Sequence, residues 1–221
     1  MPTPDRPDVD RSNPGPAVRL AVLISGGGSN LRALLDAIDD DPDFGGEVVV
    51  VATDRGDAGG LEHARRAGVP AVVHELAPGG DRTAWEAALA DDLVDHDVEV
   101  VVLAGFMRIL SGAFLARWPD RVVNTHPSLL PAFRGAHAVR DALAYGVALT
   151  GCTVHLVDEQ VDHGPILAQG AVPVHAEDTE DDLHERIKVV EHRLLPTCVR
   201  ALCQDRVRLD GRRVRMLPPT E

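Results

Sequence analysis

The chain has 221 residues, a hydrophobic content of 44% and a formal net charge of −13 at pH 7. This size and composition indicate one α/β domain with a substantial core, and the negative charge argues against a nucleic-acid partner. No apolar run reaches the roughly 20 residues of a membrane span, and the N-terminus lacks the apolar stretch of a signal peptide. We therefore expect a cytoplasmic protein that binds small molecules and neither nucleic acid nor membranes.

Residues 1–17 are rich in Pro and Asp and show no hydrophobic period, so they are predicted to be a disordered tail. The remainder, 18–216, is predicted to form one domain. Its first half alternates apolar runs with segments of helical spacing. The predicted strands are 18–24, 48–53, 71–73 and 99–104, and the predicted helices are 31–38, 60–67 and 81–95. This alternation predicts a parallel sheet with helices on both faces.

The pattern changes after residue 104. The predicted elements are then a short helix within 105–117, a strand ending at His126, a helix at 137–144, strands at 150–157 and 165–174, a helix over 179–203 and a hairpin around Asp210. The two strands on either side of residue 160 are expected to pair antiparallel. The predicted fold is a single-domain, Rossmann-like, three-layer α/β fold with a mostly parallel, mixed sheet of about seven strands.

Asn124 and His126 stand two residues apart at the end of an apolar run, just before Pro127. In a strand, alternate side chains point to the same face, so the amide and the imidazole are expected side by side. Acyl transfer needs such a pair, because one group holds the developing oxyanion while the other manages the proton. The alternative is that His126 is a packed or exposed histidine without a catalytic role.

The segment 25–30, Ser-Gly-Gly-Gly-Ser-Asn, lies between the first strand and the first helix. Glycines at a helix start let backbone N–H groups approach an anion, so the segment predicts a phosphate site. A dinucleotide site, with Asp54 on a ribose, is the rival interpretation, although Leu31 stands where that motif has its third glycine. A plain turn without ligand is the third.

Asp162 follows in an acidic loop, where it either faces His126 or serves as a turn residue. Glu191 is expected to hold a substrate amine only if its helix borders the glycine segment. His137 either points into the same cleft or caps the following helix. Neither the acidic loop nor the three cysteines have the spacing of a zinc site, so no metal is expected.

Four segments together resemble the phosphoribosylglycinamide formyltransferase family of folate-dependent enzymes. They are VLISGGGSNL at 22–31, VVLAGFMRIL at 101–110, NTHPSLLP at 124–131 and DHGPI at 162–166. The resemblance implies transfer of the formyl group of 10-formyltetrahydrofolate to the amine of phosphoribosylglycinamide in purine biosynthesis, by direct attack and without a metal. A homodimer is compatible with it, although the sequence does not reveal the oligomeric state.

The resemblance also implies roles for individual residues. The matching catalytic residues are Asn124, His126 and Asp162; those matching the phosphoribosylglycinamide site are Gly28, Ser29, Asn30 and Glu191; those matching the folate site are Arg82, Met107, Arg108, Ile109, Leu110, Asn124 and Asp158. The loop from Asp158 to Asp162 is expected to fold over the pterin.

The chain departs from the family pattern at Gly27, Arg134 and His163, which puts substrate affinity in question but not the three catalytic positions. Formyltetrahydrofolate hydrolase is the nearest alternative. It usually has an additional N-terminal domain, whereas methionyl-tRNA formyltransferase has an additional C-terminal one. A nicotinamide-dependent oxidoreductase and a non-catalytic binder of phosphate ligands are alternatives from other classes.

Overall fold

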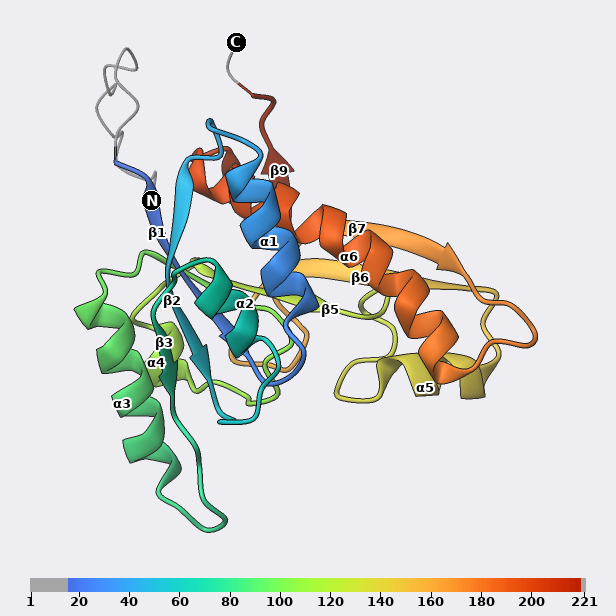
Figure 1. The fold of residues 1–221 in the computed structure, drawn as a ribbon. Coiled ribbons are helices and arrows are strands. Elements are labelled where there is room, and N and C mark those ends of the chain that lie inside the picture. Colours follow the sequence, from blue (N-terminus) through green and yellow to red (C-terminus); the bar gives the residue numbers. More distant parts are fainter. Residues whose placement is uncertain (1–15, 220–221) are drawn as a thin grey trace.

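The structure is a computed structural model that describes residues 16–219. The predicted tail at 1–17 therefore lies almost entirely outside the described residues. A seven-stranded sheet in the order β3-β2-β1-β4-β5-β6-β7 forms the centre of the molecule (Figure 1). Its strands are β1 (Val18–Ile24), β2 (Gly46–Thr53), β3 (Ala71–Val73), β4 (Val100–Leu103), β5 (Val122–His126), β6 (Leu149–Leu156) and β7 (Ile166–Pro173).

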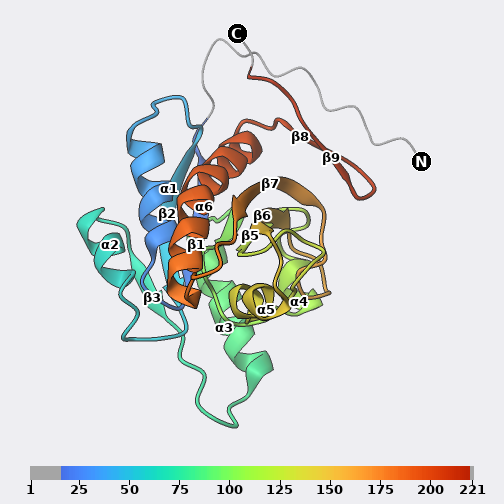
Figure 2. The same cartoon turned by 90° about the vertical axis from the view of Figure 1, so that its right-hand side faces the viewer.

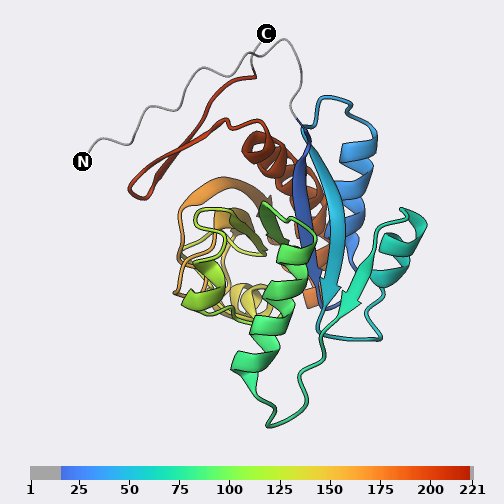
Figure 3. The same cartoon turned by 90° about the vertical axis from the view of Figure 1, so that its left-hand side faces the viewer.

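Helices cover both faces of this sheet, as the alternating pattern predicts. On one face, α1 (Ser29–Asp39), α2 (Leu61–Arg66) and the long α6 (Glu180–Cys203) enclose an apolar cluster built on the even-numbered residues of β1. On the other, α3 (Arg82–Asp95) and α4 (Gly112–Leu115) contribute to a second apolar cluster, which includes Ala21 and Leu23 of β1. Figure 3 shows α3 in front of this face of the sheet. Both side-chain sets of Leu20–Ile24 are thus buried, which explains the continuous apolar sequence of this part of β1.

Strands β1 to β5 are parallel to one another. At the end of the sheet β6 pairs antiparallel with β5, and β7 pairs antiparallel with β6. Helix α5 (Ala138–Tyr145) precedes β6, and a separate hairpin of β8 (Val207–Asp210) and β9 (Arg213–Met216) follows α6. The hairpin lies beside β7 (Figure 2). The predicted mixed sheet, antiparallel pair and terminal hairpin are all confirmed.

Two helix starts also follow the sequence. The Asp81 side chain accepts hydrogen bonds from the N–H groups of Thr83 and Ala84 and caps α3. Thr179 and Asp182 form a capping box at the start of α6, an arrangement typical of this three-residue spacing. Across residues 16–219 no helix is both long and apolar enough to cross a membrane.

The strand order determines where a ligand can bind. Strand β1 pairs with β2 on one side and with β4 on the other, so the chain changes direction across the sheet at this point. In open α/β sheets such a point opens a crevice at the carboxyl ends of the strands. The glycine segment after β1 and the residues after β4 both lie at this edge, next to the end of β5.

Candidate active site

His126 lies at the end of β5 with both ring nitrogens next to oxygen atoms. Its Nδ1 is 3.3 Å from Oδ2 of Asp162, and its Nε2 donates to the carbonyl oxygen of Phe133 at 2.8 Å. The His126 ring is buried, and Asp162 is half-buried. An imidazole that carries protons on both nitrogens satisfies both acceptors. Of the two interpretations of Asp162, the contact with His126 fits the one in which the carboxylate faces the imidazole.

A second histidine, His155 on β6, completes the cluster, and sequence reasoning missed its role. It stands opposite Asn124 in the antiparallel pair, and its Nε2 accepts a hydrogen bond from Nδ2 of Asn124 at 3.2 Å. The same nitrogen is 3.8 Å from Oδ1 of Asp162. Its Nδ1 donates to the carbonyl oxygen of Leu156 at 2.8 Å. Burial lowers the pKa of His155, which favours the neutral ring. In a neutral ring that is protonated on Nδ1, Nε2 is an acceptor, so the Asn124 amide must be the donor.

Asp162 sits in a loop whose shape is tightly constrained. Its φ of 49° is in the left-handed region, which residues with a side chain seldom adopt. Its Oδ2 accepts a hydrogen bond from the N–H of Gly135 at 2.7 Å. Two residues on, a Cβ at Gly164 would lie 1.9 Å from the carbonyl oxygen of Leu156, so only glycine fits there. The loop thus presents the carboxylate toward His126 and His155.

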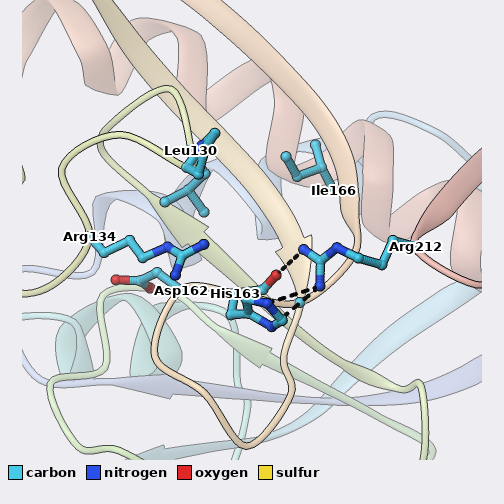
Figure 4. Close-up of a pocket in the computed structure, with 8 residues that line it drawn as sticks. Leu130, Arg134, Asp162, His163, Ile166 and Arg212 are labelled. Carbon is cyan, nitrogen blue, oxygen red and sulfur yellow. Dashed lines mark hydrogen bonds between the residues drawn. The ribbon is translucent and has the colours of Figure 1, made fainter.

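A cavity of about 300 Å³ opens beside Asp162. Leu130, Pro131 and Ile166 form an apolar wall, and Arg134 and Arg212 approach it from opposite sides (Figure 4). Arg134, one of the departures from the family pattern, therefore lies at the site and not elsewhere on the surface.

The glycine segment forms an open helix start at the end of β1. Gly28 is the N-cap of α1, with a φ of 73° and no side-chain cap. A Cβ on Gly28 would lie 2.5 Å from Cα of Gly60, so the two loops touch through their glycines. The first-turn N–H groups of a helix have no partner within the helix, and together with the helix dipole they favour an anion. This geometry suits a phosphate.

Helix α6, which carries Glu191, borders the glycine segment. The sequence analysis requires this neighbourhood for Glu191 to hold a substrate amine. The buried Glu191 carboxylate accepts hydrogen bonds from Nδ2 of Asn30 at 3.1 Å and from Oγ1 of Thr125 at 3.2 Å. Thr125 alternates with Asn124 and His126 along β5, so Glu191 reaches this strand from its opposite face. Its two oxygens retain lone pairs for a further donor.

Asp54 occupies the position that a ribose-binding carboxylate would take, but other side chains bind it. Ser25 Oγ donates to Oδ1 at 2.6 Å, and Nε of Arg108 lies 2.6 Å from Oδ2. Ser25 Oγ also accepts from the N–H of Met107 at 2.9 Å. A cavity of about 400 Å³ borders this network. The ion pair of the buried Asp54 carboxylate with half-buried Arg108 argues against the dinucleotide interpretation.

The segment after β4 presents apolar side chains to the same edge. Met107 is 70% exposed and Ile109 is 59% exposed, whereas Leu110 is buried against the α3 side of the core. The Arg82 guanidinium donates to the carbonyl oxygen of Ile109. The exposed apolar surface of this segment therefore consists of Met107 and Ile109, with the Arg82 cation at its end. The buried Leu110 side chain is not part of this surface.

The remaining predicted residues are less closely tied to the cluster. Asp158 bonds within its own loop, to His163 and to the N–H of Gln160. His137 is the exposed N-cap of α5 and makes no side-chain cap bond. Within residues 16–219 no group of three or more His, Cys, Asp or Glu is arranged to hold a metal ion. Burial raises the pKa of each cysteine thiol to about 12, so these thiols are poor nucleophiles.

Comparison with known proteins assigns this arrangement to a family. The formyl transferase profile matches residues 18–199, within the predicted domain 18–216. The phosphoribosylglycinamide formyltransferase of Mycobacterium tuberculosis H37Rv is 50% identical over 206 residues, which cover 93% of this chain and 94% of that protein.

Among the solved structures similar to this computed structural model are a transformylase and a deformylase. Glycinamide ribonucleotide transformylase 1 from Symbiobacterium toebii has 49% sequence identity and a TM-score of 0.88 over 92% of this chain and 96% of its own. A formyltetrahydrofolate deformylase from Pseudomonas syringae has 26% identity and a TM-score of 0.86 over 93% of this chain and 67% of its own. The chain belongs to the formyl transferase family and, within it, to the phosphoribosylglycinamide formyltransferases.

Proposed function

We propose that the chain transfers the formyl group of 10-formyltetrahydrofolate directly to the amine of phosphoribosylglycinamide, a step of purine biosynthesis. The observation that carries this proposal is the cluster of one amide, one imidazole and one carboxylate at the end of β5, beside an open helix start. The identity of 49–50% to enzymes named for this reaction or substrate supports the acceptor.

The three side chains divide the chemistry of formyl transfer. The neutral amine attacks the formyl carbon, a C–N bond forms, and the carbonyl oxygen becomes an oxyanion. The Asn124 amide donates to this oxyanion, aligned by its hydrogen bond to His155. His126 turns an N–H group from its protein acceptor to the oxyanion and then protonates the folate nitrogen as the C–N bond to the donor breaks. Asp162 accepts the proton of the attacking amine through water.

The two substrates approach from different strands. The phosphate binds the N–H groups of Gly28, Ser29 and Asn30, and Glu191 contacts the end of the substrate that carries the amine. The folate lies against Met107 and Ile109, with Arg82 and Arg108 near its acidic end and the loop of Asp158 over the pterin. The exposed apolar side chains of this segment support the folate side. The backbone at Leu110, not its buried side chain, is available to a ligand.

Formyltetrahydrofolate hydrolase is the second candidate, because the deformylase from Pseudomonas syringae has the same fold. Its identity to this chain is 26%, against 49% for the transformylase. The protein's location in the cytoplasm and its assembly as a homodimer belong to the proposal as predictions.

The test is a spectrophotometric assay of folate product with and without phosphoribosylglycinamide. Turnover that requires the acceptor supports the transferase, and equal turnover without it would identify a hydrolase. Asn124→Ala and His126→Ala each remove an oxyanion donor, so each is expected to lower kcat by roughly 10² to 10³. Near-normal kcat in either variant would refute its assigned role.

A further inference from the structure

The loop that carries Asp162 is held by a side chain from the far end of the chain. Arg212, in the turn between β8 and β9, donates from Nη2 to the carbonyl oxygen of His163. Its Nη1 lies 3.3 Å from each nitrogen of the His163 ring. The two residues are 49 positions apart, and Figure 4 shows the guanidinium against the loop next to Asp162.

His163 connects this contact to the rest of the loop. Its Nδ1 lies 2.7 Å from Oδ2 of Asp158, whose Oδ1 accepts from the N–H of Gln160 at 3.0 Å. A ring protonated on Nδ1 donates to the carboxylate and leaves Nε2 as an acceptor for Arg212. Asp158, His163 and Arg212 thus form one polar chain across the loop, directly beside the catalytic carboxylate.

The hairpin is a firm support for this contact. The N–H of Leu217 donates to the carbonyl oxygen of Arg206, and the Arg206 side chain donates back to the carbonyl oxygen of Leu217 at 2.7 Å. These bonds close the base of the hairpin, and β9 packs against β7. The turn that carries Arg212 is therefore fixed relative to the sheet.

We propose that Arg212 is a positioning residue for the formyl transfer reaction, and that the β8–β9 hairpin is a structural part of the active site. Asp162 has a left-handed backbone conformation, which persists only where its surroundings impose it. Gly164 constrains the loop on one side of His163, and the fork of Arg212 constrains His163 itself through its carbonyl and ring. Without this fork the loop relaxes and the carboxylate turns away from His126.

The kinetic test of this inference rests on the proposed function. A second readout, backbone hydrogen exchange, is independent of that function. Arg212→Gln removes the forked cation and is expected to lower kcat by roughly 10- to 100-fold, the size of a misplacement of about 1 Å. KM for phosphoribosylglycinamide stays within about twofold, because Arg212 acts through the loop of Asp162 and makes no contact with the glycine segment. Hydrogen exchange of the backbone amides of 158–164 becomes faster in the same variant.

Two matched variants make the test specific. Arg213→Gln removes the exposed neighbouring arginine of the same hairpin and is expected to leave kcat and exchange unchanged. Arg212→Lys keeps the charge with a single point of contact and recovers part of the lost kcat. Wild-type kcat and wild-type exchange in Arg212→Gln, or an equal loss in Arg213→Gln, would overturn the inference. A wild-type protein that does not transfer the formyl group would refute the proposed function, while the exchange data would still decide the role of Arg212 in the loop.

Discussion

Asn124 depends on a partner that lies on another strand. A primary amide can rotate to present either its N–H₂ or its oxygen, and only the N–H₂ stabilises an oxyanion. His155 selects this orientation because its Nδ1 is committed to the carbonyl oxygen of Leu156, so that Nε2 can only accept. We infer that the neutral histidine positions Asn124 for its proposed role as oxyanion donor.

His155→Leu is accordingly expected to lower kcat roughly tenfold, less than Asn124→Ala, because the amide remains but loses its fixed orientation. Loss of this hydrogen bond between half-buried Asn124 and His155 also costs about 0.5–1.5 kcal/mol of stability. Both effects are measured on one preparation, by steady-state kinetics and by urea unfolding. The assigned role fails if His155→Leu turns over at the wild-type rate while Asn124→Ala does not.

The glycine segment before α1 is shaped by contact with a second loop. Gly28 has a positive φ and meets Gly60, whereas a Cβ on Gly27 has no atom within 4 Å. Gly28→Ala is expected to destabilise the protein by about 2 kcal/mol. It is also expected to raise KM for phosphoribosylglycinamide roughly tenfold, because displaced N–H groups lose about 1.4 kcal/mol of binding.

Gly27→Ala is the matched control, and it is expected to change the free energy of unfolding by less than about 0.5 kcal/mol. Urea unfolding and substrate titration of the two variants separate the roles of the neighbouring glycines. Equal stability of both variants would show that the contact with Gly60 does not constrain the segment.

Elements with local signals could be predicted from the sequence. The buried run of β1, the Asp81 cap, the capping box at Thr179 and the turn at Asp210 each depend on residues within a few positions. Alternation along β5 likewise placed Asn124 and His126 on one face. Local patterns determine such features because the hydrogen bonds that form them are local.

Contacts between distant segments could not be predicted in the same way. The pairing of Asn124 with His155 needs the register of β5 on β6, and the bond of Arg212 to His163 needs the position of the hairpin. The sequence leaves a ribose role open for Asp54, whereas in the structure Arg108, 54 residues away, binds its carboxylate. Register and packing of the whole molecule, not the composition of any one segment, determine these neighbours.

The stability of the whole molecule is expected to fall as the pH drops from about 6.5 to about 5. Burial lowers the pKa of His155 and of His192 below the ordinary 6.5, so the unfolded chain binds protons in this range that the folded chain does not. The free energy of unfolding therefore decreases on acidification, for His155 by at most about 1.4 kcal/mol per pH unit. Ion-paired carboxylates affect the free energy of unfolding only at lower pH. Hydrogen bonds from Arg65 and Arg66 lower the pKa of Glu62 from 4.5 to about 2, so the protonation of Glu62 changes stability only below about pH 4.5.

Urea unfolding of the wild type and of His155→Leu, followed by circular dichroism from about pH 7.5 to about pH 5, measures this dependence. The variant is less stable at neutral pH, but its stability changes less with pH because leucine does not titrate. His137→Gln removes an exposed histidine and is expected to retain the wild-type slope. A wild-type stability that falls no more steeply on acidification than that of His155→Leu would mean that burial does not keep His155 neutral in the folded protein. Its Nε2 could then no longer accept from Asn124, and the orientation of the oxyanion donor would need another cause.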